Sequence, residues 1–440
     1  MSLLSRPQTI QRPPGPKDSA VANLYAMRRD PIGFFTKLTR EYGDICHFNI
    51  GEQNFYLVNH PDMIKEVLVG KDRNFTKWFA VERLKEVLGQ GLFVSEGAYH
   101  ARQRKLSQPA FHRTRIAAYA DTMVKVAQRV RDRWENGKAI DLAAEMNWLA
   151  MVIVADTLFG ADVESEAVDI QNALSEVLHM LEKSVIPPNE VADFDQARIR
   201  LDDAVLRIIQ ERRAKGGDSG DLLSMLLAAR DEDGAGMSDI ELRDEAMTIF
   251  LAGHETTANA LTWTWYLISK HPEIEKQLHR VVDSVLQGNA PKLEDISRLK
   301  YVEMIFAEGM RLYPPVWVVG RRAINDCEIG GNRIPAGSIM LLSQYITQHD
   351  ARFFEEPEKF DPQRWTQEAE LSRPKYSYFP FSSGSRQCLG EPFAWMEGVI
   401  ALSVIAQKWQ LKLAPGHRVE MQPQLTLRSK YGMRMVPVKR

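Results

Sequence analysis

The stretch "FPFSSGSRQCLGEP", residues 379–392, holds one of the three cysteines of this 440-residue chain. Gly384 and Gly390 permit backbone conformations and close approaches that other residues obstruct, so a flat, bulky ligand fits beside them. The following residues predict a helix with a proline in its first turn, and a helix start favours a thiolate at Cys388. Arg386 adds positive charge nearby. A lone cysteine is ordinarily an inert buried side chain, but this loop favours a thiolate that binds a ligand.

The composition is that of an ordinary globular protein, with 44% hydrophobic residues, 26% charged residues and a formal net charge of -2. This balance gives no reason to expect nucleic acid. Three cysteines, far apart and without a CxxC pattern, predict neither a disulfide framework nor structural zinc, which fits a reducing cytosol. The start of the chain reaches Arg6 and then prolines before any signal peptide or anchor forms, and the apolar run at 148–155 is too short to span a membrane. We expect a soluble, cytoplasmic monomer, although a chain trimmed of its anchor shows the same pattern.

The order of periodic segments predicts a mainly α protein with a small β region. A β-hairpin is expected at 44–59, and short β runs are expected between 320 and 345 and again at 419–438. Amphipathic helical patterns cover 62–69, 98–135, 140–159, 166–183 and 193–214. Because no internal repeat or low-complexity linker interrupts the chain, we expect one catalytic domain over 1–440, with a proline-rich, extended start over roughly 1–20.

A long buried helix is predicted from the capping-box spacing of Ser238 and Glu241 to Lys270, just before a proline. Its middle is apolar on nearly all sides, yet it contains "GHETT", residues 253–257. Glycine and β-branched residues weaken a helix, and a buried carboxylate is costly. One interpretation is a polar stripe that reaches solvent. The other is a cavity beside Gly253, where Glu255 and Thr256 offer a proton-relaying acid and alcohol.

Glu308 and Arg311 have i, i+3 spacing on a helix that must end before Pro314. On a surface such a pair contributes only a few tenths of a kcal/mol. Their apolar neighbours make burial plausible, and "FDPQRW" supplies Arg364 further along the chain. A carboxylate shared by two guanidiniums would pin two distant segments together.

Taken together, these segments resemble the cytochrome P-450 superfamily. "FSSGSRQCLG" is similar to its haem-binding signature F-x-x-G-x-R-x-C-x-G, and "AGHETT" is similar to its oxygen-activating helix motif. Glu308 and Arg311 match its E-x-x-R pair, and "DPQRW" matches its meander. The four motifs occur in the expected order, and the resemblance covers essentially the whole chain.

The resemblance implies the P-450 fold, with haem b between the central long helix and the helix after the cysteine loop. Cys388 would be the axial ligand of the haem iron, and the acid and alcohol Glu255 and Thr256 would deliver protons during oxygen activation. The implied haem contacts are Phe381, Gly384, Arg386, Gly390, His100, Arg104, Arg321, Ala252 and Gly253, of which the arginines and the histidine would meet the propionates. Glu308, Arg311 and Arg364 would be structural. Gln363 departs from the residues common in the meander, and His100 stands where many members have an aromatic residue.

The implied partners are O2, a hydrophobic small molecule and a separate ferredoxin or flavodoxin-type system that supplies electrons from NAD(P)H. The run "HARQRKLSQPAFHRTR", residues 100–115, is basic without an acidic residue; it is either solvated surface or the docking face for an acidic carrier, shared with Arg386 and Lys408. By family analogy the substrate pocket is lined by Trp78, Phe79, Met180, Ala252, Thr256, Val316, Val318, Val319, Leu425, Thr426 and Leu427. This mainly apolar set suits a fatty-acid-like or terpenoid ligand, and Lys77, Arg83 or Lys85 would hold a carboxylate at the mouth or simply lie at the surface.

Three functions therefore compete. A monooxygenase needs both the thiolate haem and the acid–alcohol pair, and both are present. A peroxide-driven haem-thiolate enzyme would more naturally lack the pair and carry a basic residue for a substrate carboxylate. A non-enzymatic haem-based ligand or gas sensor would have no use for proton delivery.

Overall fold

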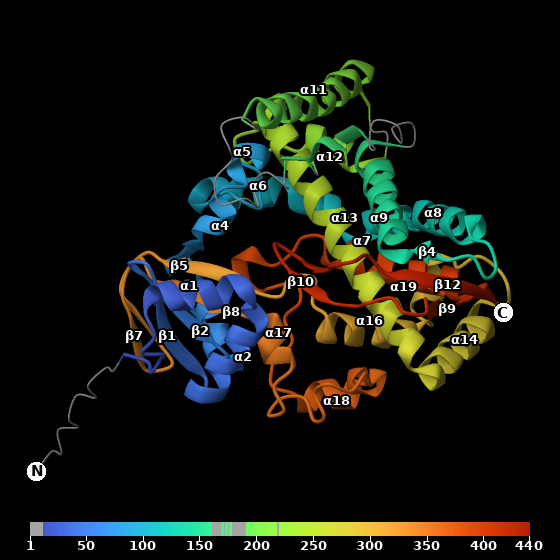
Figure 1. Cartoon of the computed structure of the whole chain (residues 1–440). Helices are drawn as coiled ribbons and strands as arrows, with labels where there is room; N and C mark the ends of the chain where they lie inside the picture. Colours follow the sequence, from blue (N-terminus) through green and yellow to red (C-terminus); the bar gives the residue numbers. More distant parts are fainter. Residues whose placement is uncertain (1–11, 161–168, 171, 175, 178–190, 218–219) are drawn as a thin grey trace, which may run out of the picture. The chain divides into compact units, whose positions relative to one another are not determined.

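The computed structural model describes residues 12–160, 169–170, 172–174, 176–177, 191–217 and 220–440 (Figure 1). Contacts divide the chain into two compact units, which we describe separately. The first unit comprises Met1–Trp78, Val316–Lys359 and Thr366–Cys388, and the second comprises Phe79–Pro315, Phe360–Trp365 and Leu389–Arg440. The single catalytic domain stays a prediction. Most of the helical stretch expected at 166–183 and part of the extended start lie outside the described residues.

The first unit is built around a five-stranded sheet flanked by short helices. Its elements are α1 (Ala20–Arg29), α2 (Pro31–Tyr42), β1 (Ile45–Ile50), β2 (Gln53–Val58), α3 (Pro61–Lys65), the π-helix η1 (Glu66–Gly70), η2 (Asp72–Asn74), β3 (Phe75–Lys77), β5 (Val319–Ala323), β6 (Cys327–Ile329), β7 (Asn332–Ile334), β8 (Ile339–Leu342), α17 (Gln344–Gln348), α18 (Gln367–Ser372) and η5 (Gly384–Arg386).

The hairpin predicted at 44–59 is confirmed, since β1 and β2 pair antiparallel from Ile45 opposite Val58. The sheet order is β1-β2-β8-β5-β3, with β2 and β8 parallel and the other pairs antiparallel. Apolar side chains from these strands and from α3 and η1 form a buried cluster that includes Phe379. The cysteine loop therefore starts from a residue fixed in the core of this unit.

The second unit is mostly helical. Its elements are α4 (Phe79–Glu82), α5 (Lys85–Leu88), α6 (Gly97–Ser107), η3 (Gln108–Phe111), α7 (Arg113–Ala118), α8 (Ala120–Arg133), β4 (Ile140–Asp141), α9 (Leu142–Phe159), α11 (Val191–Lys215), α12 (Leu222–Ala228), α13 (Asp239–Lys270), α14 (Pro272–Leu286), α15 (Leu293–Ile296), α16 (Lys300–Leu312), η4 (Pro362–Trp365), α19 (Glu391–Ala406), β9 (Trp409–Leu413), β10 (Met421–Pro423), β11 (Leu427–Ser429) and β12 (Arg434–Lys439).

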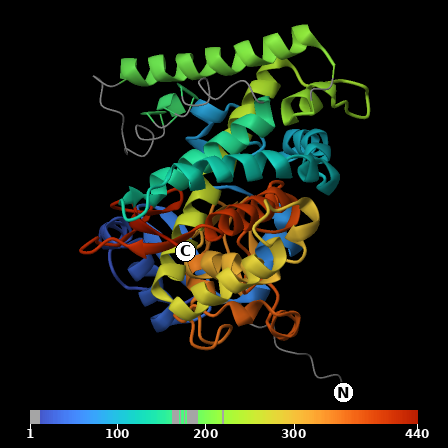
Figure 2. The same cartoon turned by 90° about the vertical axis from the view of Figure 1, so that its right-hand side faces the viewer.

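The long helix α13 organises this unit and begins and ends where the sequence predicts. The Ser238 hydroxyl accepts a hydrogen bond from the Glu241 amide, and the Glu241 carboxylate accepts one from the Ser238 amide. Its most extensive packing partner is α9, and α16 and α19 also pack against it (Figure 2). Among the described residues α9 alone is long and apolar enough to cross a membrane, but 67% of that stretch is buried inside the structure. Its length and composition are those that core helices also have.

Two segments differ from the expected pattern. The helical stretch at 98–135 is divided into α6, η3, α7 and α8, with Pro109 in the break, where it removes a backbone donor. The β region expected up to residue 345 ends at Leu342, because Ser343 caps the short helix α17 with its hydroxyl. The last β region, by contrast, is found as β10, β11 and β12.

We predict that Ser238→Ala lowers the free energy of unfolding by about 1 kcal/mol, because it removes the hydroxyl that caps α13. Ser238→Asp is the matched control and should keep most of the stability, since an aspartate also caps a helix. Denaturant midpoints at pH 7 measure both variants. Equal midpoints for Ser238→Ala and wild type would contradict a stabilising role for this cap.

Candidate active site

The cysteine loop of the first unit is closed by its own backbone. The Cys388 amide donates to the Phe381 carbonyl at 3.0 Å, and the Gln387 amide donates to the Gly384 carbonyl at 3.1 Å. Cys388 itself is exposed and is followed within three residues by the start of α19. The loop thus presents a thiol on a short, hydrogen-bonded turn.

Gly384 is required by this turn for two independent reasons. Its φ is +70°, a conformation that side chains other than glycine rarely adopt, and a Cβ at this position would lie 2.0 Å from the Leu68 carbonyl oxygen. Gly390 differs, because its φ of -77° is open to any residue. A backbone conformation that favours glycine is therefore found at Gly384 and not at Gly390, whose close approach to a ligand stays a prediction.

The other two cysteines are poor candidates for a ligand thiolate. Burial raises the pKa of Cys46 to about 12, and burial also raises the pKa of Cys327. Cys388 is the exposed one of the three, all of which lie within the described residues. An exposed thiol on a turn that allows close backbone approach fits an axial ligand of a flat group such as haem.

The residues expected to meet the propionates come from both units. In the first unit Arg386 is half-buried, and Arg321 on β5 is buried and donates to the Gly320 carbonyl at 3.0 Å. In the second unit His100 and Arg104 lie four residues apart, on the same face of α6, with His100 buried.

Helix α13 brings the predicted acid Glu255 against the β10–β11 hairpin. The Glu255 carboxylate is buried, and the Nε of Arg428 lies 2.6 Å from its Oε1. The Thr426 hydroxyl donates to the same oxygen, and Asn259 donates to the Thr426 hydroxyl at 3.1 Å. Thr426, expected in the substrate pocket, therefore also belongs to the carboxylate's own hydrogen-bond network.

These contacts decide the charge of Glu255. Burial alone would raise its pKa, but the hydrogen bond and charge of Arg428, with the Thr426 hydroxyl, outweigh burial and hold the pKa below its usual value. The neighbouring His254 has its pKa lowered chiefly by burial, and its Nδ1 lies 2.8 Å from the Phe250 carbonyl. In this arrangement Glu255 is an ionised carboxylate and not an acid with a proton to donate.

The missing side chain of Gly253 does not open a groove. A Cβ there would lie 2.9 Å from a methyl group of Val154 on α9, so the glycine permits close packing of two helices. The prediction of a cavity on this side of Gly253 is therefore wrong. Ala252 is exposed, and the Thr256 hydroxyl donates to its carbonyl at 2.8 Å.

The Glu308 carboxylate lies near two guanidiniums, those of Arg311 and Arg364, as the sequence predicted. Its two oxygens lie 2.8 Å and 2.9 Å from Nε and Nη2 of Arg311, with both side chains fully buried. Arg364 approaches Oε1 at 3.3 Å. The Trp365 indole donates at 2.9 Å and the Asp361 amide at 3.0 Å. Hydrogen bonds from Arg311, Trp365 and the Asp361 amide, together with the nearby charge of Arg364, thus surround one carboxylate.

The expected substrate-pocket residues are distributed over both units. In the first unit Val316, Val318 and Val319 are half-buried, and the Trp78 ring occupies the space that a Cβ on Gly320 would need. In the second unit Phe79 is 49% exposed. Met180 lies outside the described residues.

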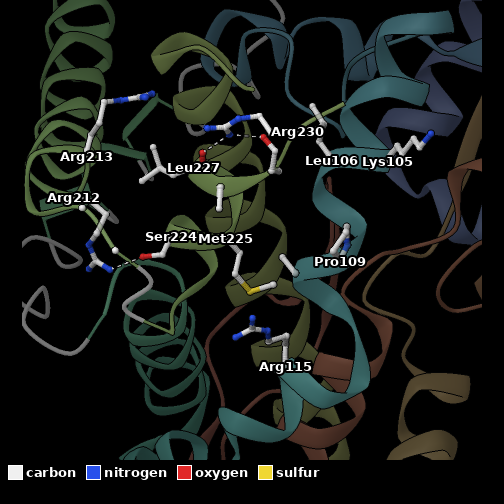
Figure 3. Close-up of a pocket in the computed structure, with 15 residues that line it drawn as sticks. Lys105, Leu106, Pro109, Arg115, Arg212, Arg213, Ser224, Met225, Leu227 and Arg230 are labelled. Carbon is white, nitrogen blue, oxygen red and sulfur yellow. Dashed lines mark hydrogen bonds between the residues drawn. The ribbon is translucent and has the colours of Figure 1, made fainter. Parts of the chain in front are cut away.

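A separate pocket of about 560 Å³ lies within the second unit (Figure 3). Its cationic lining residues are Lys105, Arg115, Arg212, Arg213 and Arg230. Three of these cations already have carboxylate partners, in the pairs Lys105–Glu232, Arg212–Asp221 and Arg213–Asp239. The pocket includes none of the residues that the sequence analysis assigned to haem or substrate.

Sequence reasoning missed Arg428, Asn259 and Trp365 as parts of these networks. Trp365 could have been inferred, because a buried indole N–H needs an acceptor and it adjoins Arg364. Arg428 had no such signal, since it is 173 residues from Glu255.

An exposed cysteine on a tight turn and a helix carrying Glu255 and Thr256, within a mainly helical fold, fit what a haem-thiolate monooxygenase requires. The sequence profile described as Cytochrome P450 matches residues 13–435. The chain belongs to this family, which implies haem.

Several known proteins are similar over nearly the whole chain. Cyclooctatin synthase of Streptomyces melanosporofaciens is 38% identical, covering 93% of this chain and 92% of that protein. Pentalenene oxygenase of Streptomyces avermitilis is 33% identical, covering 90% of each. A crystallised cytochrome P-450 haem domain has a TM-score of 0.91 at 27% identity, covering 98% of both chains. The predicted P-450 fold is confirmed.

We predict that Arg311→Gln lowers the free energy of unfolding by roughly 3–5 kcal/mol, because it removes one partner of a buried charge pair. Arg298→Gln is the matched control: Arg298 also pairs at i, i+3, with Asp295, but its side chain is 59% exposed. It should cost less than about 1 kcal/mol. Denaturant unfolding of both holoenzymes measures the difference, and similar losses would contradict a special role for the buried pair.

Proposed function

We propose that this monooxygenase inserts one oxygen atom from O2 into a terpenoid, by hydroxylation or epoxidation. The observation that carries the chemistry is the exposed Cys388 on a turn that only Gly384 allows. The substrate class is supported by relatives whose names specify cyclooctat-9-en-7-ol and pentalenene. These names favour a terpenoid over the fatty-acid-like ligand that the sequence also allowed.

In this proposal Cys388 holds the haem iron through its sulfur, and the bound haem supplies the oxygen-activating redox chemistry. Arg386, Arg321, His100 and Arg104 pair with the propionates. The remaining haem contacts are Phe381, Gly384, Gly390, Ala252 and Gly253. Glu308, Arg311 and Arg364 hold α16 and the segment at 361–365 together.

Proton delivery is assigned to Thr256 and Glu255. The Thr256 hydroxyl now donates to the Ala252 carbonyl, and rotation about one bond would free it to donate elsewhere. Glu255 must take up a proton before it can supply one, because its pKa is held low. The two groups therefore act one after the other: Thr256 donates its hydroxyl proton, and Glu255 then replaces that proton.

Electrons come, in this proposal, from NAD(P)H through a separate ferredoxin or flavodoxin-type carrier in the cytoplasm. The exposed Arg113 of the basic run suits an acidic carrier. Arg102 and Lys105 contribute less to docking than the sequence suggests, because Asp231 and Glu241 bind the first and Glu232 binds the second. Lys408 is similarly paired with Asp132.

We predict that a reduced, CO-treated sample shows the red-shifted absorbance typical of thiolate ligation, and that Cys388→Ser loses it. Cys327→Ser is the control and should keep it, because Cys327 lies on β6, outside the cysteine loop, and burial raises its pKa. An unshifted band in the wild-type holoenzyme would overturn the assignment of Cys388.

We also predict that cyclic terpene hydrocarbons and alcohols change the haem absorbance on binding, whereas saturated fatty acids of equal carbon number bind more weakly. A mainly apolar pocket should prefer the uncharged ligand, because burying the carboxylate of a fatty acid costs free energy. Titrations read by haem absorbance compare the two series. Tighter binding of the fatty acids would contradict the proposed substrate class.

A further inference from the structure

The β10–β11 hairpin is fixed to α13 by contacts other than the Glu255 pair. The Trp263 indole on α13 donates to the Leu427 carbonyl at 2.9 Å. The Leu427 amide donates to the Pro315 carbonyl at 2.8 Å. The hairpin therefore has a defined position beside the helix even without the charge pair, and Arg428 is held where it can reach the carboxylate.

The charge on Glu255 depends on this position. Among the residues that the structure describes, the charged group that faces Glu255 from outside its own helix is Arg428, and the titratable one beside it on α13 is His254, whose pKa burial lowers. Burial alone raises the pKa of the Glu255 carboxyl, so removing Arg428 shifts this group toward the neutral acid. The contact with Arg428 thus decides whether Glu255 is an ionised carboxylate or a neutral acid that can donate a proton.

We propose that Arg428 is the positioning residue that keeps Glu255 ionised, and that the fixed hairpin thereby sets the pH range in which this carboxyl can supply a proton to Thr256. Only proton transfer is involved: the carboxylate takes up a proton from water and becomes ionised again when it gives this proton to the Thr256 oxygen, which has passed on its own hydroxyl proton. The inference rests on the proposed function, in which Glu255 and Thr256 deliver protons.

Four holoenzymes test the pair: wild type, Arg428→Met, Glu255→Gln and the double variant. In wild type the folded-state pKa of Glu255 lies below its unfolded value, so the pair stabilises the fold above about pH 4.3 and this contribution is lost as the pH falls through the folded pKa. In Arg428→Met the folded pKa lies above the unfolded value. In this variant the neutral acid stabilises the fold fully below about pH 4.3, and this contribution is lost as the pH rises through the folded-state pKa.

The expected result is that Arg428→Met raises the unfolding equilibrium constant at least about tenfold more at pH 8 than at pH 5, since each pKa unit is a factor of ten. Denaturant unfolding at both pH values measures this. In the Glu255→Gln background the same substitution should have no such pH dependence. Arg428→Lys keeps the charge and should restore most of the wild-type profile.

Infrared difference spectra give a direct readout of the protonation state. At pH 7 the Arg428→Met holoenzyme should show the carbonyl band of a protonated carboxylic acid, relative to the double variant, and wild type should not show it relative to Glu255→Gln. A pH-independent effect of Arg428→Met, together with no acid band, would overturn the inference.

The catalytic readout is the fraction of consumed NAD(P)H recovered as product, measured with a terpenoid that binds in the absorbance titrations. Arg428→Met should shift the pH dependence of this fraction upward by about one unit or more, and Glu255→Gln should abolish the shift. An unshifted profile overturns the inference. If instead the CO spectrum lacked the thiolate shift, the proposed function would fail while the stability and infrared arms still decided the role of Arg428.

Discussion

A carboxylate can stay charged in an apolar interior only where donors from other parts of the chain meet it. Glu308 on α16 and Glu255 on α13 both meet this condition. Glu308 is bound by Arg311 on its own helix and by the segment at 361–365, whereas Glu255 is bound from the β10–β11 hairpin. Each carboxylate therefore fixes a distant segment to its helix. The two buried carboxylates thus determine where the segment at 361–365 and the β10–β11 hairpin lie.

The same unit contains a contrasting case. Glu397 on α19 is fully buried, and neither carboxyl oxygen has a hydrogen-bond partner among the described residues. Burial raises its pKa well above the usual value. This carboxyl avoids the cost of desolvation by staying neutral, whereas Glu255 stays ionised because Arg428 is present. The comparison shows that the partner, and not burial itself, decides the protonation state in this helical unit.

The sequence predicted those features that depend on neighbours along the chain. The hairpin at 44–59, the capping box of α13 and the end of α16 before Pro314 all follow from local patterns, and all are found. The cysteine loop was also predicted from the sequence, because Gly384 and Cys388 are only four residues apart.

What the sequence could not predict depends on residues far apart in the chain. Gly253 looked like an opening because nothing local shows that Val154 fills the space beside it. The basic run at 100–115 looked uniformly positive because its acidic partners, such as Asp231 and Glu241, come from beyond residue 230. Both features depend on long-range packing, which periodicity and spacing do not encode.

The parallel pairing of β2 with β8 has a consequence for how the chain is made. In this sheet the Gln53 side chain donates to the Gly337 carbonyl, 284 residues later in the sequence. At a translation rate of about 5–20 residues per second, β8 is synthesised roughly a quarter of a minute to a minute after β2, so the edge of β2 stays unpaired for that time. During that time the nascent hairpin exposes unpaired amides and apolar side chains to other chains in the cell. The sheet of the first unit is therefore completed only after β8 has been translated.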